Sequence, residues 1–269
     1  KTAYEIASCL VGSEMCIRDS LDLESKPGKA PGGYNYPLYE TGAPFIFMNA
    51  VGSQGDLSTM IHEGGHAVHS FLTHGLELTA FKSFPSEIAE LASMSMELLT
   101  MEHWDEFYEK ADDLKRAKKE QLQGTITILP WIAQIDAFQH WIYENHEHTA
   151  TERTAYWMEL NERFGTGLVD WKGYEETLAS SWQRQMHLFE VPFYYIEYGI
   201  AQLGAIGVWR NSKSDFKQAV DNYRAALSLG YTKSMPEVYA KAGIDFNFSG
   251  DYICQLANFV ASELEKLGA

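Results

Sequence analysis

His62-Glu63-Gly64-Gly65-His66 is the stretch that decides how this chain is interpreted. Two histidines four residues apart lie on one face of an α-helix, where both imidazoles can bind one zinc ion. The flanking residues fit a helix, since Asp56 and Ser58 can cap its start and Gly75 can end it. Its apolar side comprises Leu57, Met60, Ile61, Ala67, Val68, Phe71 and Leu72. The motif therefore predicts a zinc hydrolase.

Glu63 directly follows the first histidine. This position turns its carboxylate away from the metal and toward a water molecule in the open position of a catalytic zinc ion, where a general base is needed. Gly64 and Gly65 are unusual inside a helix, because each costs about 1 kcal/mol relative to alanine. We therefore expect something to approach the helix closely at these two residues.

A catalytic zinc ion also needs a third protein ligand. The extended HExxHxxGxxH motif would require Gly at position 69 and His at position 72, where this chain has His69 and Leu72. A carboxylate on a later helix, predicted within residues 84–104, is therefore expected to complete the site. The candidates are Glu87, Glu90 and Glu97. Glu90 and Glu97 share a helix face, so periodicity does not decide between them.

Five further histidines are not expected to bind the metal. His69 lies one helical turn beyond His66, and a fourth protein ligand would leave no room for water, so His69 is interpreted as a supporting or packing residue. The other four lack ligand spacing to the motif and are interpreted as surface or core residues: His103, His140, His146 and His148. Core packing likewise explains three tryptophans at apolar helical positions: Trp131, Trp141 and Trp182.

Hydrolysis of a peptide bond places negative charge on a carbonyl oxygen, so hydrogen-bond donors besides the metal are expected. The segment from His187 to Gly199 offers one histidine and three tyrosines. Pro192 can begin a helix in which Tyr194 and Tyr198 are one turn apart, with Tyr195 and Tyr198 as the rival pair. Core packing is the alternative role for each tyrosine.

Together these residues resemble a known family. His62 to His66 followed by His69, and Glu90-Leu91-Ala92-Ser93 followed by Glu97, are similar to the thimet oligopeptidase and oligoendopeptidase F family of zinc metallopeptidases. The resemblance covers nearly everything from Leu21 to the C-terminus, with similar stretches at residues 28–34, 44–49, 136–141, 187–198 and 242–245.

The resemblance implies roles for particular residues. The third ligand in that family is the Glu that begins the Glu-x-x-Ser step, which is Glu90 in this chain. A histidine and tyrosines of residues 187–198 bind substrate and stabilise the tetrahedral intermediate there, which implies these roles for His187, Tyr198 and Tyr194. The family also implies a deep channel between two largely helical halves, and hence oligopeptide substrates.

Residues 9–20, Cys9-Leu-Val-Gly-Ser-Glu-Met-Cys-Ile-Arg-Asp-Ser20, resemble the in-frame translation of a sequencing adapter. We interpret residues 1–20 as an artefactual or unrelated N-terminus and residues 21–269 as the catalytic domain. Two of the three cysteines fall in this segment, so a disulfide framework is excluded and Cys254 is expected to be a buried, inert thiol. The chain starts without Met or a leader, which predicts the C-terminal part of a longer protein.

The chain carries a net charge of −16, or −15 without the adapter-like segment. Either charge opposes binding to nucleic-acid phosphates and favours basic or N-terminally charged peptides, although an acidic surface also serves solubility alone. The chain has no apolar run of about eighteen residues that would predict a membrane span. We therefore expect a soluble, cytoplasmic protein with neither nucleic-acid nor membrane partners.

Periodicity predicts a mostly helical fold with a small β element beside the motif helix. Phe45 to Met48 is the expected strand, and almost everything after Asp56 is expected to be helical, with breaks near residues 165–167, Gly230, Pro236 and Gly243. The strand is expected to border the cleft, where an extended peptide could pair with its edge. The predicted class is a mostly α, zincin-like catalytic domain that forms the C-terminal part of a larger two-lobed peptidase.

The predicted function is a zinc-dependent endopeptidase acting on oligopeptides. His62, His66 and Glu90 would hold one Zn²⁺ ion, and Glu63 would be the general base. Two alternatives remain. A zinc carboxypeptidase would need a positive group for the terminal carboxylate, and a catalytically silent peptide-binding fragment would lack the N-terminal half of the cleft.

Overall fold

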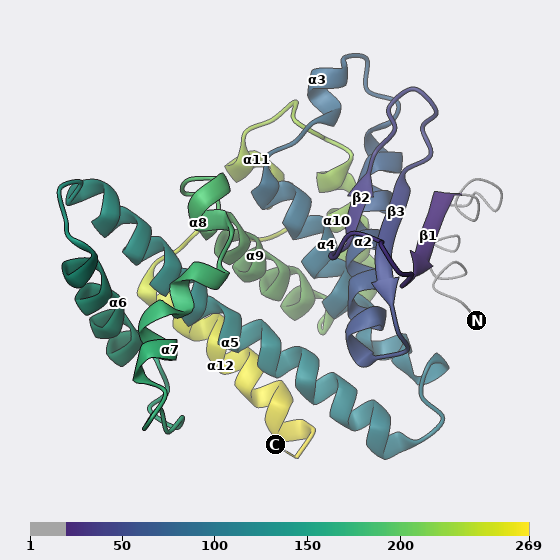
Figure 1. The fold of residues 1–269 in the computed structure, drawn as a ribbon. Helices are drawn as coiled ribbons and strands as arrows, with labels where there is room; N and C mark the ends of the chain where they lie inside the picture. Colours follow the sequence, from purple (N-terminus) through teal and green to yellow (C-terminus); the bar gives the residue numbers. More distant parts are fainter. Residues whose placement is uncertain (1–19, 269) are drawn as a thin grey trace. The chain divides into compact units, whose positions relative to one another are not determined.

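The structure is a computed structural model that describes residues 20–268, and it consists mainly of helices (Figure 1). The chain forms two compact units, whose described parts are residues 20–122 with 201–268 and residues 123–200. The predicted catalytic domain at residues 21–269 spans both units. The adapter-like segment, apart from Ser20, lies outside the described residues.

The first unit contains a three-stranded sheet and most of the helices. Its boundaries with the second unit fall inside the helices α5 (Ala111–Glu144) and α9 (Ile196–Ser212). Its other elements are β1 (Leu21–Glu24), β2 (Tyr34–Tyr36), β3 (Phe45–Ala50), α2 (Gln54–Thr73), α3 (Thr79–Lys82), α4 (Ser86–Thr100), the 3-10 helix η2 (Met101–Glu106), α10 (Phe216–Leu227), α11 (Met235–Lys241) and α12 (Gly250–Lys266).

The sheet packs against α2, the helix that carries the histidine motif (Figure 1). Its strand order is β1-β3-β2, with β1 parallel and β2 antiparallel to the central strand β3. Alternate residues of β3, Ile46 and Met48, are buried against Met60 and Ala67 of α2. The predicted strand is therefore confirmed as part of β3, and β2 forms one edge of the sheet.

Lys29 ties the glycine-rich loop between β1 and β2 to the sheet. Its ammonium group donates hydrogen bonds to the carbonyl oxygens of Asp22, Glu24 and Met48 at 2.9, 2.8 and 2.6 Å. It also lies 3.2 Å from the Asp22 carboxylate. One side chain thus fixes the loop to both β1 and β3, and the loop continues to Gly33, which lies against α2.

The start of α2 differs in detail from the prediction. Ser53 is the N-cap, and the Asp56 carboxylate accepts hydrogen bonds from the backbone N–H groups of residues 51–53 at 2.6 to 2.8 Å. The prediction that Ser58 caps the helix is wrong, because Ser58 lies inside α2 and its hydroxyl donates to Gln121 Oε1 at 3.0 Å. The helix ends at Thr73, just before the predicted terminator Gly75.

Helix α4 packs closely against α2, and Gly65 lies where the two backbones come close together. A Cβ atom at Gly65 would lie 2.6 Å from the Cα atom of Ser93 and 2.8 Å from the carbonyl oxygen of Ala92. A Cβ at Gly64, in contrast, would meet nothing within 4 Å in the described structure. The expected close approach is therefore confirmed at Gly65 and wrong at Gly64, which faces open space.

The second unit consists of helical segments around an aromatic core. Its elements are the second part of α5, α6 (Ala150–Phe164), α7 (Glu175–Ser180), the 3-10 helix η3 (Ser181–Arg184), α8 (His187–Glu190) and the beginning of α9. Its core is formed by Ile135, Phe138, Trp157 and Leu160, against which Trp131 and Trp182 pack. The interpretation of these two tryptophans as packing residues is confirmed.

The prediction that a helix begins at Pro192 is wrong, because α9 begins only at Ile196. Phe193 adopts a positive φ of 59°, which ends any helical continuity after the proline. Its backbone N–H donates instead to the Gln139 side chain at 2.9 Å. The expected breaks are confirmed, since residues 165–174 lie between α6 and α7, Pro236 lies at the start of α11, and Gly230 and Gly243 have positive φ angles.

Cys254 corrects another expectation, because its side chain is exposed rather than buried. The buried stripe of α12 is formed by Tyr252, Leu256 and Val260, which recur every four residues. Cys254 is two residues from this stripe and so lies on the opposite side of the helix. Helices that could span a lipid bilayer are absent from the described part of the chain.

A matched pair of substitutions tests the packing of α2 against α4. Gly65→Ala is expected to lower the free energy of unfolding by about 1–3 kcal/mol, because its methyl group meets the α4 backbone. Gly64→Ala is expected to raise it by up to about 1 kcal/mol, because alanine favours the helix and the space is open. Urea unfolding followed by circular dichroism measures the free energy of unfolding of both variants. Equal effects of the two substitutions would contradict the conclusion that Gly65, and not Gly64, lies against α4.

Candidate metal centre and active site

Three side chains from α2 and α4 converge at the motif. The Nε2 atom of His62 lies 3.2 Å from Glu90 Oε2, and Nε2 of His66 lies 3.8 Å from the same oxygen. One donor atom from each residue falls within 4.8 Å of the others, and within residues 20–268 no other histidine, cysteine or acidic residues form such a group. Two imidazoles and a carboxylate can hold a transition-metal ion.

The Glu-x-x-Ser step on α4 has a direct structural role. The Ser93 hydroxyl donates a hydrogen bond to Glu90 Oε2 at 2.9 Å, and Ser93 is also the residue that Gly65 contacts most closely. Although burial favours the neutral form, the hydrogen bond from His62 and the neighbouring imidazoles hold the pKa of Glu90 below its usual value. The carboxylate is therefore oriented toward the histidines and ionised.

His62 and His66 differ in the protonation state that their surroundings favour. Burial lowers the pKa of His66 to about 4, so its ring is neutral and can act as a metal ligand. Burial also disfavours charge on His62, but hydrogen bonds to Glu90 and Glu97 outweigh this effect and raise its pKa to about 10. A cation bound between the donors would replace the proton on His62 Nε2.

Glu97 contacts Nδ1 of His62, whereas Glu90 contacts Nε2, so the two glutamates have different positions at the ring. The Glu97 Oε1 atom is 2.7 Å from His62 Nδ1, and its Oε2 accepts a hydrogen bond from Gln121 Nε2 at 2.6 Å. A carboxylate in this position fixes the ring orientation and leaves Nε2 directed at Glu90. Glu87, the remaining candidate, does not belong to the converging group.

Gln121 belongs to a hydrogen-bonded chain that the sequence did not reveal. Its Oε1 accepts from Ser58, whose hydroxyl accepts from Gln54 Nε2 at 3.3 Å, and Gln54 Oε1 accepts from the Tyr108 hydroxyl. Every bond in this chain donates toward Glu97. No local pattern marks Gln121, because it lies in a charged stretch of α5 and acts only through residues distant in sequence.

Glu63 is buried beside this centre and faces a cavity. The cavity has a volume of about 300 Å³ and is lined by Gly33, Ser58, Thr59, His62, Glu63 and Glu97. Burial raises the pKa of Glu63 to about 7, and among the described residues its Oε2 atom has no hydrogen-bond partner. A Cβ at Gly33 would lie 3.5 Å from the other carboxylate oxygen, so the glycine-rich loop forms the wall opposite Glu63.

His69 is fully buried on α2, two helical turns beyond His62, and plays a packing role. Its ring stacks on Phe84, with centroids 3.5 Å apart, and burial lowers its pKa to about 3. It is absent from the converging donor group, as the sequence predicted.

The second unit holds a cluster of the predicted oxyanion donors. His187 Nε2 lies 3.4 Å from the Tyr198 hydroxyl, and the His187 ring stacks on Tyr194 with centroids 5.8 Å apart. Both predicted tyrosine pairs are ring contacts, since Tyr194 and Tyr195 each pack against Tyr198. Burial lowers the pKa of His187, which keeps the ring neutral.

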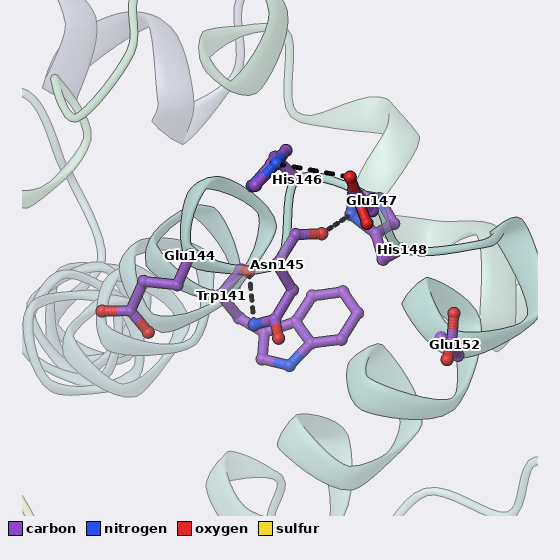
Figure 2. Close-up of a pocket in the computed structure, with 7 residues that line it drawn as sticks. All are labelled: Trp141, Glu144, Asn145, His146, Glu147, His148 and Glu152. Atoms are coloured by element: carbon purple, nitrogen blue, oxygen red, sulfur yellow. Dashed lines mark hydrogen bonds and ion pairs between the residues drawn. The ribbon is translucent and has the colours of Figure 1, made fainter.

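A second pocket lies at the turn between α5 and α6 and contains two of the histidines interpreted as non-ligands (Figure 2). Its volume is about 370 Å³. His146 lies 3.9 Å from its neighbour Glu147, whereas His148 Nδ1 contacts the carbonyl oxygen of Asn145 at 2.7 Å. Their ring nitrogens are directed at different partners, and neither histidine belongs to the converging donor group.

Comparisons with known proteins place this chain among peptidases. Oligopeptidase PepF of Bacillus subtilis (strain 168) is 27% identical over an alignment of 257 residues that covers 92% of this chain and 37% of that protein. The plasmid-encoded oligoendopeptidase F of Lactococcus lactis subsp. cremoris is 28% identical over 256 residues, covering 92% of this chain and 41% of that protein. The structure of PZ peptidase A with an inhibitor superposes with a TM-score of 0.86 at 29% identity, covering 97% of this chain and 47% of that one.

The chain thus spans less than half the length of these relatives. The mostly helical fold with a small sheet, predicted from periodicity, is confirmed by the structure and its neighbours. The sequence model of peptidase family M3 matches residues 3–257. The match covers most of the chain, and the chain therefore belongs to peptidase family M3.

Proposed function

We propose that this chain is the catalytic part of a zinc-dependent endopeptidase that hydrolyses peptide bonds in oligopeptides. The observation that carries the proposal is the convergence of His62, His66 and Glu90 beside Glu63, a buried carboxylate that faces a cavity. The names of the relatives, oligopeptidase PepF and oligoendopeptidase F, support oligopeptides as the substrate class.

The donor set fits zinc. Two histidines and one glutamate are the three protein ligands of many catalytic zinc sites, which keep a further position open. Glu97 supports this fit, because it accepts the Nδ1 proton of His62 and leaves Nε2 for the metal. A bound zinc ion lowers the pKa of water to about 7 and polarises the peptide carbonyl.

Glu63 acts as the general base in this proposal. Its carboxylate takes a proton from the attacking water and delivers it to the leaving amine when the peptide bond breaks. The Glu63 side chain lines the cavity, and its Oε2 atom has no hydrogen-bond partner among the described residues, which supports this role.

Substrate binding follows from the surroundings of Glu63. The edge strand β2 continues from Gly33, and it pairs with β3 on one side only within the described sheet, so an extended peptide can add to its other side. A net charge of −16 favours basic peptides. In the same proposal, His187, Tyr198 and Tyr194 of the second unit supply the hydrogen-bond donors for the carbonyl oxygen as it becomes negative.

The role of Glu63 is tested by Glu63→Gln in the full chain. We expect this variant to retain bound zinc and to lose about two or more orders of magnitude in kcat, because the amide cannot accept the proton. Cleavage of a quenched fluorescent peptide and metal analysis measure the two quantities. Glu87→Gln is the control and should keep normal turnover. Unchanged turnover in Glu63→Gln would refute the assignment.

The three glutamates of α4 are distinguished by zinc affinity. Glu90→Gln is expected to weaken zinc binding most, because it removes a ligand charge. Glu97→Gln is expected to weaken it about 10–100-fold, because it disturbs the orientation of His62. Glu87→Gln should have no effect. Competition with a fluorescent chelator measures the zinc affinity of all three variants. A larger loss of affinity in Glu97→Gln than in Glu90→Gln would indicate that Glu97, and not Glu90, is the ligand.

Blocked peptides separate the endopeptidase from its alternatives. Cleavage of a peptide amidated at its C-terminus is expected, because an endopeptidase needs no free carboxylate. A zinc carboxypeptidase would cleave only the free-acid form of the same peptide. A catalytically silent fragment would bind both peptides, seen by fluorescence anisotropy, and would cleave neither with zinc present.

A further inference from the structure

The side chains of Trp131, Gln185 and His187 are linked in series by hydrogen bonds. Trp131 of α5 donates its indole N–H to Gln185 Oε1 at 3.2 Å, and Gln185 Nε2 lies 2.6 Å from His187 Nδ1. On the other side of the ring, His187 Nε2 faces the Tyr198 hydroxyl. All four residues belong to the second compact unit.

Trp131 fixes the orientation of the Gln185 amide. An indole N–H can only donate, so the group that faces it must be the amide oxygen of Gln185. The reversed amide would direct an NH₂ group at the indole N–H, so that two donors would face each other. The NH₂ end of Gln185 is therefore turned toward His187.

The orientation of Gln185 in turn decides which nitrogen of His187 carries the proton. The Gln185 NH₂ group donates to Nδ1, so Nδ1 must be the unprotonated nitrogen. A neutral imidazole carries one proton, which then lies on Nε2. The His187 ring thus presents a donor on the side of Tyr198.

Packing contacts hold the Trp131 indole in a fixed position, so that it can orient the Gln185 amide. Its ring meets Trp157 edge-on, with centroids 5.8 Å apart, and the Arg184 guanidinium lies 4.7 Å from its ring centre. The single indole N–H is also within hydrogen-bond reach of the Tyr195 hydroxyl oxygen, so Gln185 Oε1 and Tyr195 share one donor. These contacts restrict rotation of the indole and hence of the amide it faces.

We propose that Trp131 and Gln185 are positioning residues that hold His187 in its Nε2–H tautomer, so that the ring is a ready donor to the substrate oxygen. This inference rests on the proposed function, in which His187 stabilises the negative carbonyl oxygen. In the other tautomer Nε2 would be an acceptor and would repel that oxygen.

Histidine ¹⁵N NMR of the full chain tests the tautomer directly. The His187 signals are identified by their loss in His187→Ala, and ¹H–¹⁵N correlations show which ring nitrogen is protonated. We expect a proton on Nε2 in the unmodified chain. Gln185→Glu offers only acceptors and should move a proton to Nδ1, and Trp131→Phe should give a mixture, because Gln185 is then free to turn over. A proton on Nδ1 in the unmodified chain would overturn the inference.

Trp182→Phe is the matched control. Trp182 packs in the same core, with ring contacts to Phe138 and Phe189. Its carbonyl oxygen accepts from the backbone N–H of Gln185 at 3.1 Å, a bond that the substitution keeps, whereas the Gln185 amide oxygen bonds the Trp131 indole. This variant should keep the Nε2–H tautomer. A tautomer in Trp131→Phe that remains as fixed as in Trp182→Phe would contradict the role of Trp131.

Kinetics separate this inference from the proposed function. Trp131→Phe is expected to lower kcat roughly 10-fold with little change in KM, less than the about 10²–10³-fold loss expected for His187→Ala as a missing oxyanion donor. Full activity in His187→Ala would refute the proposed role of His187 while the NMR result for the tautomer stands. A kcat loss in His187→Ala combined with unaltered NMR signals in Trp131→Phe and Gln185→Glu would refute only the positioning role.

Discussion

The convergence of His62, His66 and Glu90 depends on the close packing of α2 against α4 at Gly65. A side chain there would lie 2.6 Å from the Ser93 backbone, so only glycine allows the two helices to approach. Ser93 also holds the Glu90 carboxylate through a hydrogen bond of 2.9 Å. One contact therefore sets the helix spacing and orients the third donor toward both imidazoles. The helix-propensity cost of Gly65 is offset by the geometry that it makes possible.

The local part of the site was predictable from sequence because it depends only on helix geometry. The spacing of His62 and His66, with Glu63 between them, places three chemical groups on α2 without any tertiary information. The choice between Glu90 and Glu97 was not predictable from periodicity, because both lie on one face of α4. The structure separates them by their contacts, since Glu90 reaches Nε2 of His62 and Glu97 reaches Nδ1.

Features that arise from contacts between distant residues escaped the sequence patterns. Gln121 is 63 residues from Ser58, and Gln185 is 54 residues from Trp131, so nothing in their local sequences marks them. The prediction of a helix beginning at Pro192 is wrong because of another distant contact. Phe193 takes a left-handed conformation, and its backbone N–H donates to Gln139, 54 residues away. Propensity predicts elements well only where tertiary contacts agree with it.

In the proposed mechanism, His62 and His187 have opposite tasks, and one neighbour of each prepares it for that task. Glu97 can only accept, so His62 keeps its proton on Nδ1 and leaves Nε2 for a metal ion. Gln185 donates to the equivalent nitrogen of His187, which makes Nε2 a hydrogen-bond donor instead. Both neighbours are in turn held by donors from α5, Gln121 and Trp131. An acidic or an amide side chain behind the imidazole is thus enough to make the same residue type a ligand or a donor.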